Sequence, residues 1–284
     1  MKLVSLCAGP LGVDLAPEAG GSVARFAVDG FDLMRPMTET ALALGWANES
    51  ACYPLVPFAG RIANGRFVFD DRAIEIAPNW PGQRHPMHGD GWASPWTLLR
   101  NDAYSAEIVY EHNGRKGWPF RYRARQAYRL DEHSLTVRLS LENLEDHAVP
   151  GGIGVHPYFV REPDTELQCR TDHAWRTDAD VLPIERIAVP AAWNFAKPRR
   201  IDDVALDNGF EGWDGTATVL WPSRRLCLTM RATEPFRDLV IYSPPGRPYF
   251  CVEPESHVPG AIGLTRLAAG GIIEGEVVFA ISNT

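Results

Sequence analysis

Two titratable residues in the sequence, His156 and Glu253, have the chemistry of an acid and base pair. Glu253 follows the apolar run 249–252, where an ionised carboxylate is costly unless it is paired or functional. A histidine of pKa about 6.5 can donate a proton at neutral pH, and a glutamate whose pKa burial raises above about 4.3 can accept one. Strand alternation puts Glu255 on the same face as Glu253, so Glu255 competes for this role, and His156 alone is equally compatible with a packed loop histidine.

His156 and Glu253 belong to short segments in which polar residues stand among glycine, proline and aromatic residues, a composition typical of loops at a site rather than of strand interiors. The segments are 57–62, 87–92, 154–159 and 251–257, with a fifth at 206–215. Three more polar residues in them, Arg61, His88 and Asp207, could bind a ligand. Their alternative roles are a structural ion pair for Arg61, a turn cap for His88 and an Asx turn beside Gly209 for Asp207.

In order and approximate spacing, the segments resemble the signatures of the galactose mutarotase or aldose 1-epimerase family. The matching motifs are P-F-x-x-R-I at 57–62, H-G at 88–89, an aspartate motif at 206–215, H-P-Y-F at 156–159 and E-P at 253–254. The resemblance covers about residues 54–260. The chain departs from the family at Gly60 and Asn208, where asparagine and histidine are frequent.

The resemblance implies a β-sandwich that binds a small sugar in an open cleft on one sheet. His156 would be the general acid and Glu253 the general base, which leaves Glu255 as a solvated residue at the end of its strand. Arg61, His88 and Asp207 would bind sugar hydroxyls or the ring oxygen. Opening a cyclic hemiacetal requires removal of the anomeric hydroxyl proton and delivery of a proton to the ring oxygen. Two positioned groups, each contributing about 10²–10⁴ in rate, suffice for this, so no cofactor and no metal are expected.

An aromatic platform for the apolar face of a sugar could come from several tryptophans, and the sequence does not choose among them. The candidates are Trp80, Trp92, Trp96, Trp118 and Trp213. His85 and His88 are three residues apart, but Pro86 opposes a helix that would present both to a metal ion, and no third ligand is near.

The sequence predicts that the elements which position these residues are β-strands. Glycine (25) and proline (23) occur throughout the chain and leave little room for long helices. Period-two alternation predicts a long hairpin over 122–130 and 135–141, with a turn at 131–133 and the arginines of 121–129 on a solvated face. Further strands are predicted at 67–69, 74–76, 106–110, 216–220, 226–230, 239–242, 249–252 and 277–281, and 180–212 is the least regular part. The pattern predicts an all-β, large antiparallel β-sandwich in one domain over residues 1–284.

The amino-acid composition of the chain limits the classes of molecule that it is expected to bind. A net charge of −8 opposes binding to nucleic acid or to anionic lipid, and no apolar run approaches the length of a membrane span. The five dispersed cysteines indicate reduced, mostly buried thiols, and the N-terminus lacks the apolar core of a signal peptide. We therefore expect a cytoplasmic monomer or homodimer whose partner is a small sugar, with no nucleic-acid or membrane partner.

Three other functions remain open. An epimerase for hexose 6-phosphates would use Arg61, Arg66 and Arg84 as extra positive charge near the cleft. A non-catalytic carbohydrate-binding β-sandwich would have no use for both His156 and Glu253. A glycosidase would pair Glu253 with Asp90 or Asp207 and would leave the histidine without a task.

Overall fold

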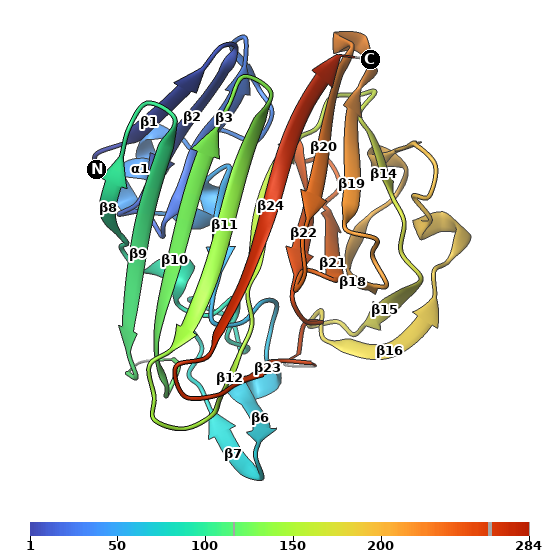
Figure 1. Cartoon of the computed structure of the whole chain (residues 1–284). Helices are drawn as coiled ribbons and strands as arrows, with labels where there is room; N and C mark the ends of the chain where they lie inside the picture. The colour runs from blue at the N-terminus through green and yellow to red at the C-terminus, as the bar shows by residue number, and fades with distance from the viewer. Residues whose placement is uncertain (116, 261–262, 284) are drawn as a thin grey trace.

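A computed structural model describes residues 1–115, 117–260 and 263–283, and two large antiparallel sheets dominate it (Figure 1). The first sheet runs in the order β1 (Val4–Ala8), β2 (Leu11–Ala16), β3 (Ser22–Val28), β5 (Cys52–Leu55), β13 (Gly154–Val160), β22 (Tyr249–Glu255), β21 (Asp238–Ser243), β18 (Leu206–Glu211), β15 (His173–Thr177) and β16 (Pro183–Ala188), with β4 (Phe31–Asp32) beside β3. The second runs β17 (Arg199–Arg200), β14 (Glu166–Cys169), β19 (Thr216–Trp221), β20 (Leu226–Ala232), β24 (Ile272–Asn283), β11 (Ser134–Asn143), β10 (Arg121–Leu130), β9 (Ser105–Asn113) and β8 (Thr97–Asn101).

Smaller elements lie in the connections between the strands. Two small two-stranded antiparallel sheets complete the fold: the hairpin of β6 (Arg66–Phe69) and β7 (Arg72–Glu75), and the pair of β12 (Val149–Gly151) with β23 (Thr265–Leu267). The helix α1 (Glu39–Leu44) is capped by Thr38 and Gly45, and short 3-10 turns lie at Ala47–Glu49, Ala63–Gly65, Gly91–Ala93, Ala191–Trp193, Ile201–Asp203 and Pro222–Arg224. No helix in the described parts of the chain has the length and apolarity needed to cross a bilayer. The predicted all-β sandwich is confirmed.

The hairpin β10–β11 forms where the alternation predicted it. Asp131 closes its turn, because one carboxylate oxygen accepts hydrogen bonds from the backbone amides of His133 and Ser134, both at 2.8 Å. The side chains of Tyr122 and Tyr128 point into the core, while the arginines face outward. Arg123, for example, pairs across strands with Glu111 at 2.7 Å. The solvated arginine face is confirmed.

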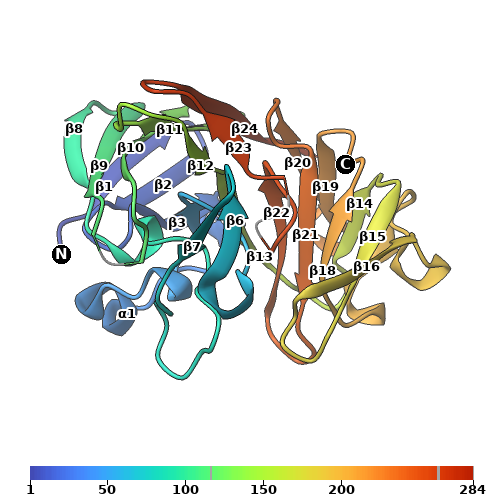
Figure 2. The same cartoon turned by 90° about the horizontal axis from the view of Figure 1, so that it is seen from below.

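The main core lies between the two sheets, where aromatic rings from both meet. Phe159 of β13 contacts Phe250 of β22 at 5.7 Å between ring centroids and Phe279 of β24 at 6.3 Å. Figure 2, the view from below, shows α1 on the side of β1–β3 that faces away from β9–β11. The helix α1 therefore lies on the outer face of this end of the first sheet. Because one continuous core joins the sheets, we propose that residues 1–284 form one domain.

Residues 180–212 contain β16, β17 and β18 as well as two 3-10 turns, so this region is more regular than the sequence indicated. A second correction concerns 154–159, whose composition suggested a loop. This segment is β13, a central strand paired with β5 and β22 and buried on both faces. A strand of this kind shows no polar alternation, since neither face meets water.

Candidate active site

The outer face of the first sheet carries a pocket of about 310 Å³, lined by side chains of β5, β13, β22, β21 and β18. Strand alternation on β22 creates this polar floor: Phe250 and Val252 point into the core between the sheets, whereas Glu253 points to the pocket. All five site residues predicted from the sequence line this pocket: Arg61, His88, His156, Asp207 and Glu253.

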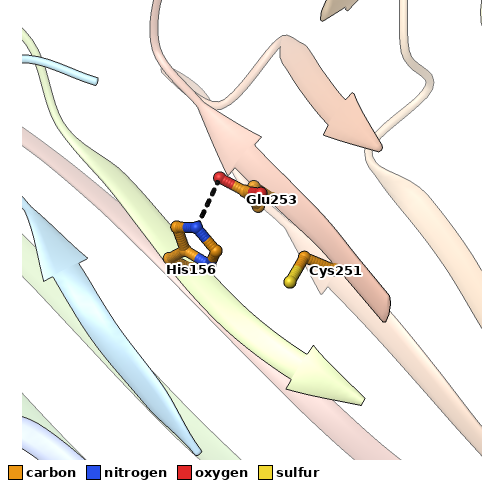
Figure 3. Close-up of side chains that lie close together, drawn as sticks. All are labelled: His156, Cys251 and Glu253. Carbon is orange, nitrogen blue, oxygen red and sulfur yellow. Dashed lines mark ion pairs between the residues drawn. The ribbon is translucent and has the colours of Figure 1, made fainter. Parts of the chain in front are cut away.

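His156 and Glu253 lie side by side although 97 positions separate them in the chain. The register pairs Gly154 with Glu255 and Tyr158 with Cys251, which places His156 across from Glu253 on the neighbouring strand. The imidazole Nε2 is 3.4 Å from a carboxylate oxygen of Glu253 (Figure 3). This distance allows a proton to pass between the two groups with little movement.

Burial determines which form of the pair is favoured. Loss of water raises the pKa of Glu253 well above its usual value and lowers the pKa of His156 well below its own. The charges of Glu255 and Asp207 raise the pKa of Glu253 further, and Arg61 opposes them. The favoured state is a neutral carboxyl beside a neutral imidazole. This neutral pair has the same number of protons as a carboxylate beside an imidazolium. Transfer of one proton from Glu253 to His156 therefore gives the base and the acid that the sequence predicted.

Two tyrosine rings hold the His156 imidazole in place. Tyr53 and Tyr158 lie on it with ring centroids at 4.6 Å, and the Tyr158 ring is nearly parallel to the imidazole. The guanidinium of Arg35 lies 3.9 Å from the centre of the Tyr158 ring and donates to the backbone oxygens of Asn48 and Ser50 at 2.7 and 2.9 Å. Its positive charge helps to lower the pKa of His156. The sequence analysis missed Arg35, because no motif surrounds it.

His88 is held by an exchange of backbone hydrogen bonds with Gly60. The Gly60 amide donates to His88 Nδ1 at 3.1 Å, and the His88 amide donates to the Gly60 carbonyl at 2.9 Å. Burial and the nearby Arg61 lower the pKa of His88 to about 3, so the ring is neutral. Since Nδ1 accepts, Nε2 carries the hydrogen and can donate to a ligand in the pocket.

Gly60 departs from the family pattern, and its local structure requires glycine here. Its φ is +66°, and a Cβ atom would lie 2.4 Å from Pro259. We expect Gly60→Ala to destabilise the fold by about 1–3 kcal/mol, because Pro259 or the loop must move, and to weaken binding at His88. Gly82→Ala is the matched control, since Gly82 has φ +76° but no atom within 4 Å of the added Cβ. Thermal unfolding of both variants measures the difference, and equal destabilisation would contradict the role of the Pro259 contact.

Arg61 supplies positive charge among the acids of the pocket. It lowers the pKa of Glu253 and partly offsets the burial that raises the pKa of Asp207. Asn208, the second departure from the family pattern, donates its side-chain amide to the Trp175 carbonyl at 2.9 Å and so ties β18 to β15. Asp207 and Arg61 together offer an acceptor and planar donors to a ligand.

Two of the five candidate tryptophans line the pocket. Trp80 and Trp92 stack on each other with ring centroids at 5.2 Å, and Trp92 is fixed by donating its indole N–H to the Gly89 carbonyl at 3.1 Å. The other candidates, Trp96, Trp118 and Trp213, are core residues. Trp175, which the sequence analysis did not single out, also lines the pocket.

Two residues differ from the sequence expectation in position. Glu255, taken as a solvated residue at the end of its strand, is fully buried, and neither carboxyl oxygen has a hydrogen-bond partner among the described residues. Burial and Asp238, its neighbour on β21, raise its pKa well above the usual value.

Asp90 lies outside the pocket and accepts hydrogen bonds from Tyr110 and Tyr122, which removes it as a glycosidase partner of Glu253.

The cysteines agree with the sequence interpretation, since all five are free thiols and three of them are buried. The two neighbouring histidines have separate backbone partners: His85 accepts a hydrogen bond from the Asn64 amide, and His88 accepts one from the Gly60 amide.

Comparisons with known proteins identify the family to which this fold belongs. The aldose 1-epimerase family model matches residues 2–264, so the chain belongs to the aldose 1-epimerase family. YphB of Escherichia coli K12, an uncharacterized protein, is 34% identical over 91% of this chain and 89% of its own length. The crystal structure of a proposed aldose 1-epimerase from Escherichia coli K12 has a TM-score of 0.93 at 31% identity, covering 100% of this chain and 99% of that one. Galactose 1-epimerase from Lactobacillus acidophilus shares the fold, with a TM-score of 0.82 at 16% identity and coverage of 100% and 95%.

Proposed function

We propose that this protein is an aldose 1-epimerase, or mutarotase, that interconverts the α and β anomers of a free aldose. The observation that carries the proposal is the 3.4 Å approach of His156 to Glu253 in a pocket that also contains Arg61, His88 and Asp207. The tryptophans Trp80 and Trp92 add an apolar surface on which a sugar ring can lie.

The proposed reaction needs only proton transfers. After the proton moves from Glu253 to His156, the carboxylate takes the proton of the anomeric hydroxyl while the imidazolium gives its proton to the ring oxygen. The bond from C1 to the ring oxygen breaks and an open-chain aldehyde forms. Rotation about the C1–C2 bond presents the other face of the aldehyde, and the same steps in reverse close the ring.

A hexose 6-phosphate is the less favoured substrate. Arg66 pairs with Glu75 on the exposed hairpin β6–β7, and neither Arg66 nor Arg84 lines the pocket. The test is polarimetry with freshly dissolved α anomers of free aldoses and of their 6-phosphates. We expect faster mutarotation with at least one free aldose, and a strict requirement for the phosphate would contradict the proposal.

Arg61 provides a test of substrate binding. We expect Arg61→Gln to raise KM by about tenfold or more, since hydrogen bonds to a charged donor contribute about 1.5–3 kcal/mol each. The alkaline limb of the pH profile should also move to higher pH, because Arg61 lowers the pKa of Glu253 and the shared proton of the pair leaves from this carboxyl. Initial rates across pH measure both effects. An unchanged KM and an unchanged alkaline limb would place Arg61 outside the reaction.

A further inference from the structure

Cys251 lies next to the proposed acid and base, and the mechanism does not use it. It occupies β22 two positions before Glu253 and therefore projects from the same face of the sheet (Figure 3). One ligand atom each of His156, Cys251 and Glu253 lies within 4.8 Å of the others, and all three residues are buried. Cys251 does not line the pocket but belongs to a small buried cluster with Tyr53 and Tyr158, two residues that do line it.

The three atoms match the ligand set of a tetrahedral metal site. Zinc binds nitrogen and oxygen at about 2.0–2.2 Å and sulfur at about 2.3 Å, which makes the edges of the tetrahedron about 3.3–3.6 Å. The separation of His156 Nε2 from the Glu253 oxygen, 3.4 Å, already equals such an edge. Cys251 Sγ lies within 4.8 Å of a ligand atom of each partner, so it would have to approach by at most about 1.5 Å to reach such an edge.

We propose that His156, Cys251 and Glu253 form an inhibitory binding site for Zn²⁺ or a similar thiophilic divalent ion. The ion would use the Nε2 lone pair and the carboxylate, which proton transfer to and from a sugar requires. The pocket side of the site stays open, so a water molecule or a sugar hydroxyl can be the fourth ligand. Magnesium and calcium are not expected to bind, because thiolate and imidazole are poor ligands for hard ions.

The inhibition rests on the proposed function, but the binding does not. The first experiment is therefore a titration of the purified protein with Co²⁺, followed by the absorption of a thiolate–cobalt charge-transfer band. We expect one Co²⁺ per chain, a band in the near ultraviolet, and loss of the band when Zn²⁺ is added. Absence of a thiolate band would overturn the proposal, whether or not the protein exchanges anomers.

The second experiment compares variants in the presence of Zn²⁺. Cys251→Ala should retain the exchange rate, lose the cobalt band and tolerate about tenfold more Zn²⁺ or a larger excess, since even residues that only orient a metal ligand change affinity about 10–100-fold. Cys251→Ser is the second variant if the alanine protein does not fold. Cys7→Ser is the control, because Cys7 is exposed on β1. Equal Zn²⁺ sensitivity of the wild type and both Cys251 variants would reject the site.

Discussion

Replacement of Glu253 by Gln should reduce anomer exchange by about 10²–10⁴-fold while sugar affinity stays within a few-fold of the wild type. Glutamine preserves the shape of the side chain and its ability to form hydrogen bonds, but it cannot take the proton of the anomeric hydroxyl. Polarimetry measures the exchange and calorimetric titration with the same sugar measures binding. A carbohydrate-binding protein without catalysis would show no enzymatic exchange even before the substitution.

Glu255→Gln is the matched control for this experiment. Both residues lie on the same face of β22 and burial raises the pKa of both, but only Glu253 is in contact with His156, at 3.4 Å. We therefore expect a much smaller loss of exchange in Glu255→Gln. Loss of exchange in the Glu255 variant with retention in the Glu253 variant would reverse the assignment of the base.

The second large effect is expected for His156→Asn, which should also lower the rate by about 10²–10⁴-fold. Asparagine can still donate a hydrogen bond from this position, but it cannot deliver a proton to the ring oxygen. His85→Asn controls for the loss of a buried imidazole, because His85 accepts a backbone hydrogen bond away from the pocket. Comparable rates for His156→Asn and the wild type would remove His156 from the mechanism.

The directions in which the pKa values of His156 and Glu253 are shifted predict how the rate of anomer exchange depends on pH. Burial raises the pKa of Glu253 and lowers the pKa of His156, so between the two values the pair keeps one exchangeable proton, on the carboxyl. The working state of carboxylate plus imidazolium has the same number of protons, which predicts a bell-shaped profile. The acid limb lies where His156 takes up a second proton, and the alkaline limb lies where Glu253 loses the one that the pair shares. In His156→Asn only Glu253 titrates, so the residual rate should rise with pH through the pKa of Glu253 and show no alkaline decline.

The strands that period-two alternation predicted have one face in contact with water, whereas the apolar runs 239–242 and 249–252 predicted parts of the buried strands β21 and β22. In β10, for instance, buried Tyr122 and Tyr128 alternate with outward-facing arginines, and the period of two is visible in the sequence. Strands buried on both faces lack this signal. The segment Ser22–Val28, which forms β3, is buried along most of its length and gave no alternation, and β13 read as a loop for the same reason.

The site was predicted where its residues fall in motifs, and missed where they do not. His156 and Glu253 were found through short segments that resemble a family, and the register of β13 and β22 brings them together. Arg35 and Trp175 reach the pocket from positions with no motif around them, so only the three-dimensional structure reveals them. Composition could not show that Glu255 is buried either, since its cross-strand neighbours Gly154 and Asp238 belong to other segments of the chain.

The central claim is that His156 and Glu253 together open and close the ring of a free aldose. Exchange spectroscopy by NMR at anomeric equilibrium measures this directly, because magnetisation passes between the H1 signals of the two anomers only when the ring opens. With catalytic amounts of wild-type protein, exchange cross-peaks should grow well above the buffer rate for at least one neutral aldose, and they should return to the buffer rate with Glu253→Gln. Cross-peaks at the buffer rate for every free aldose, or equal cross-peaks for wild type and variant, would contradict the claim.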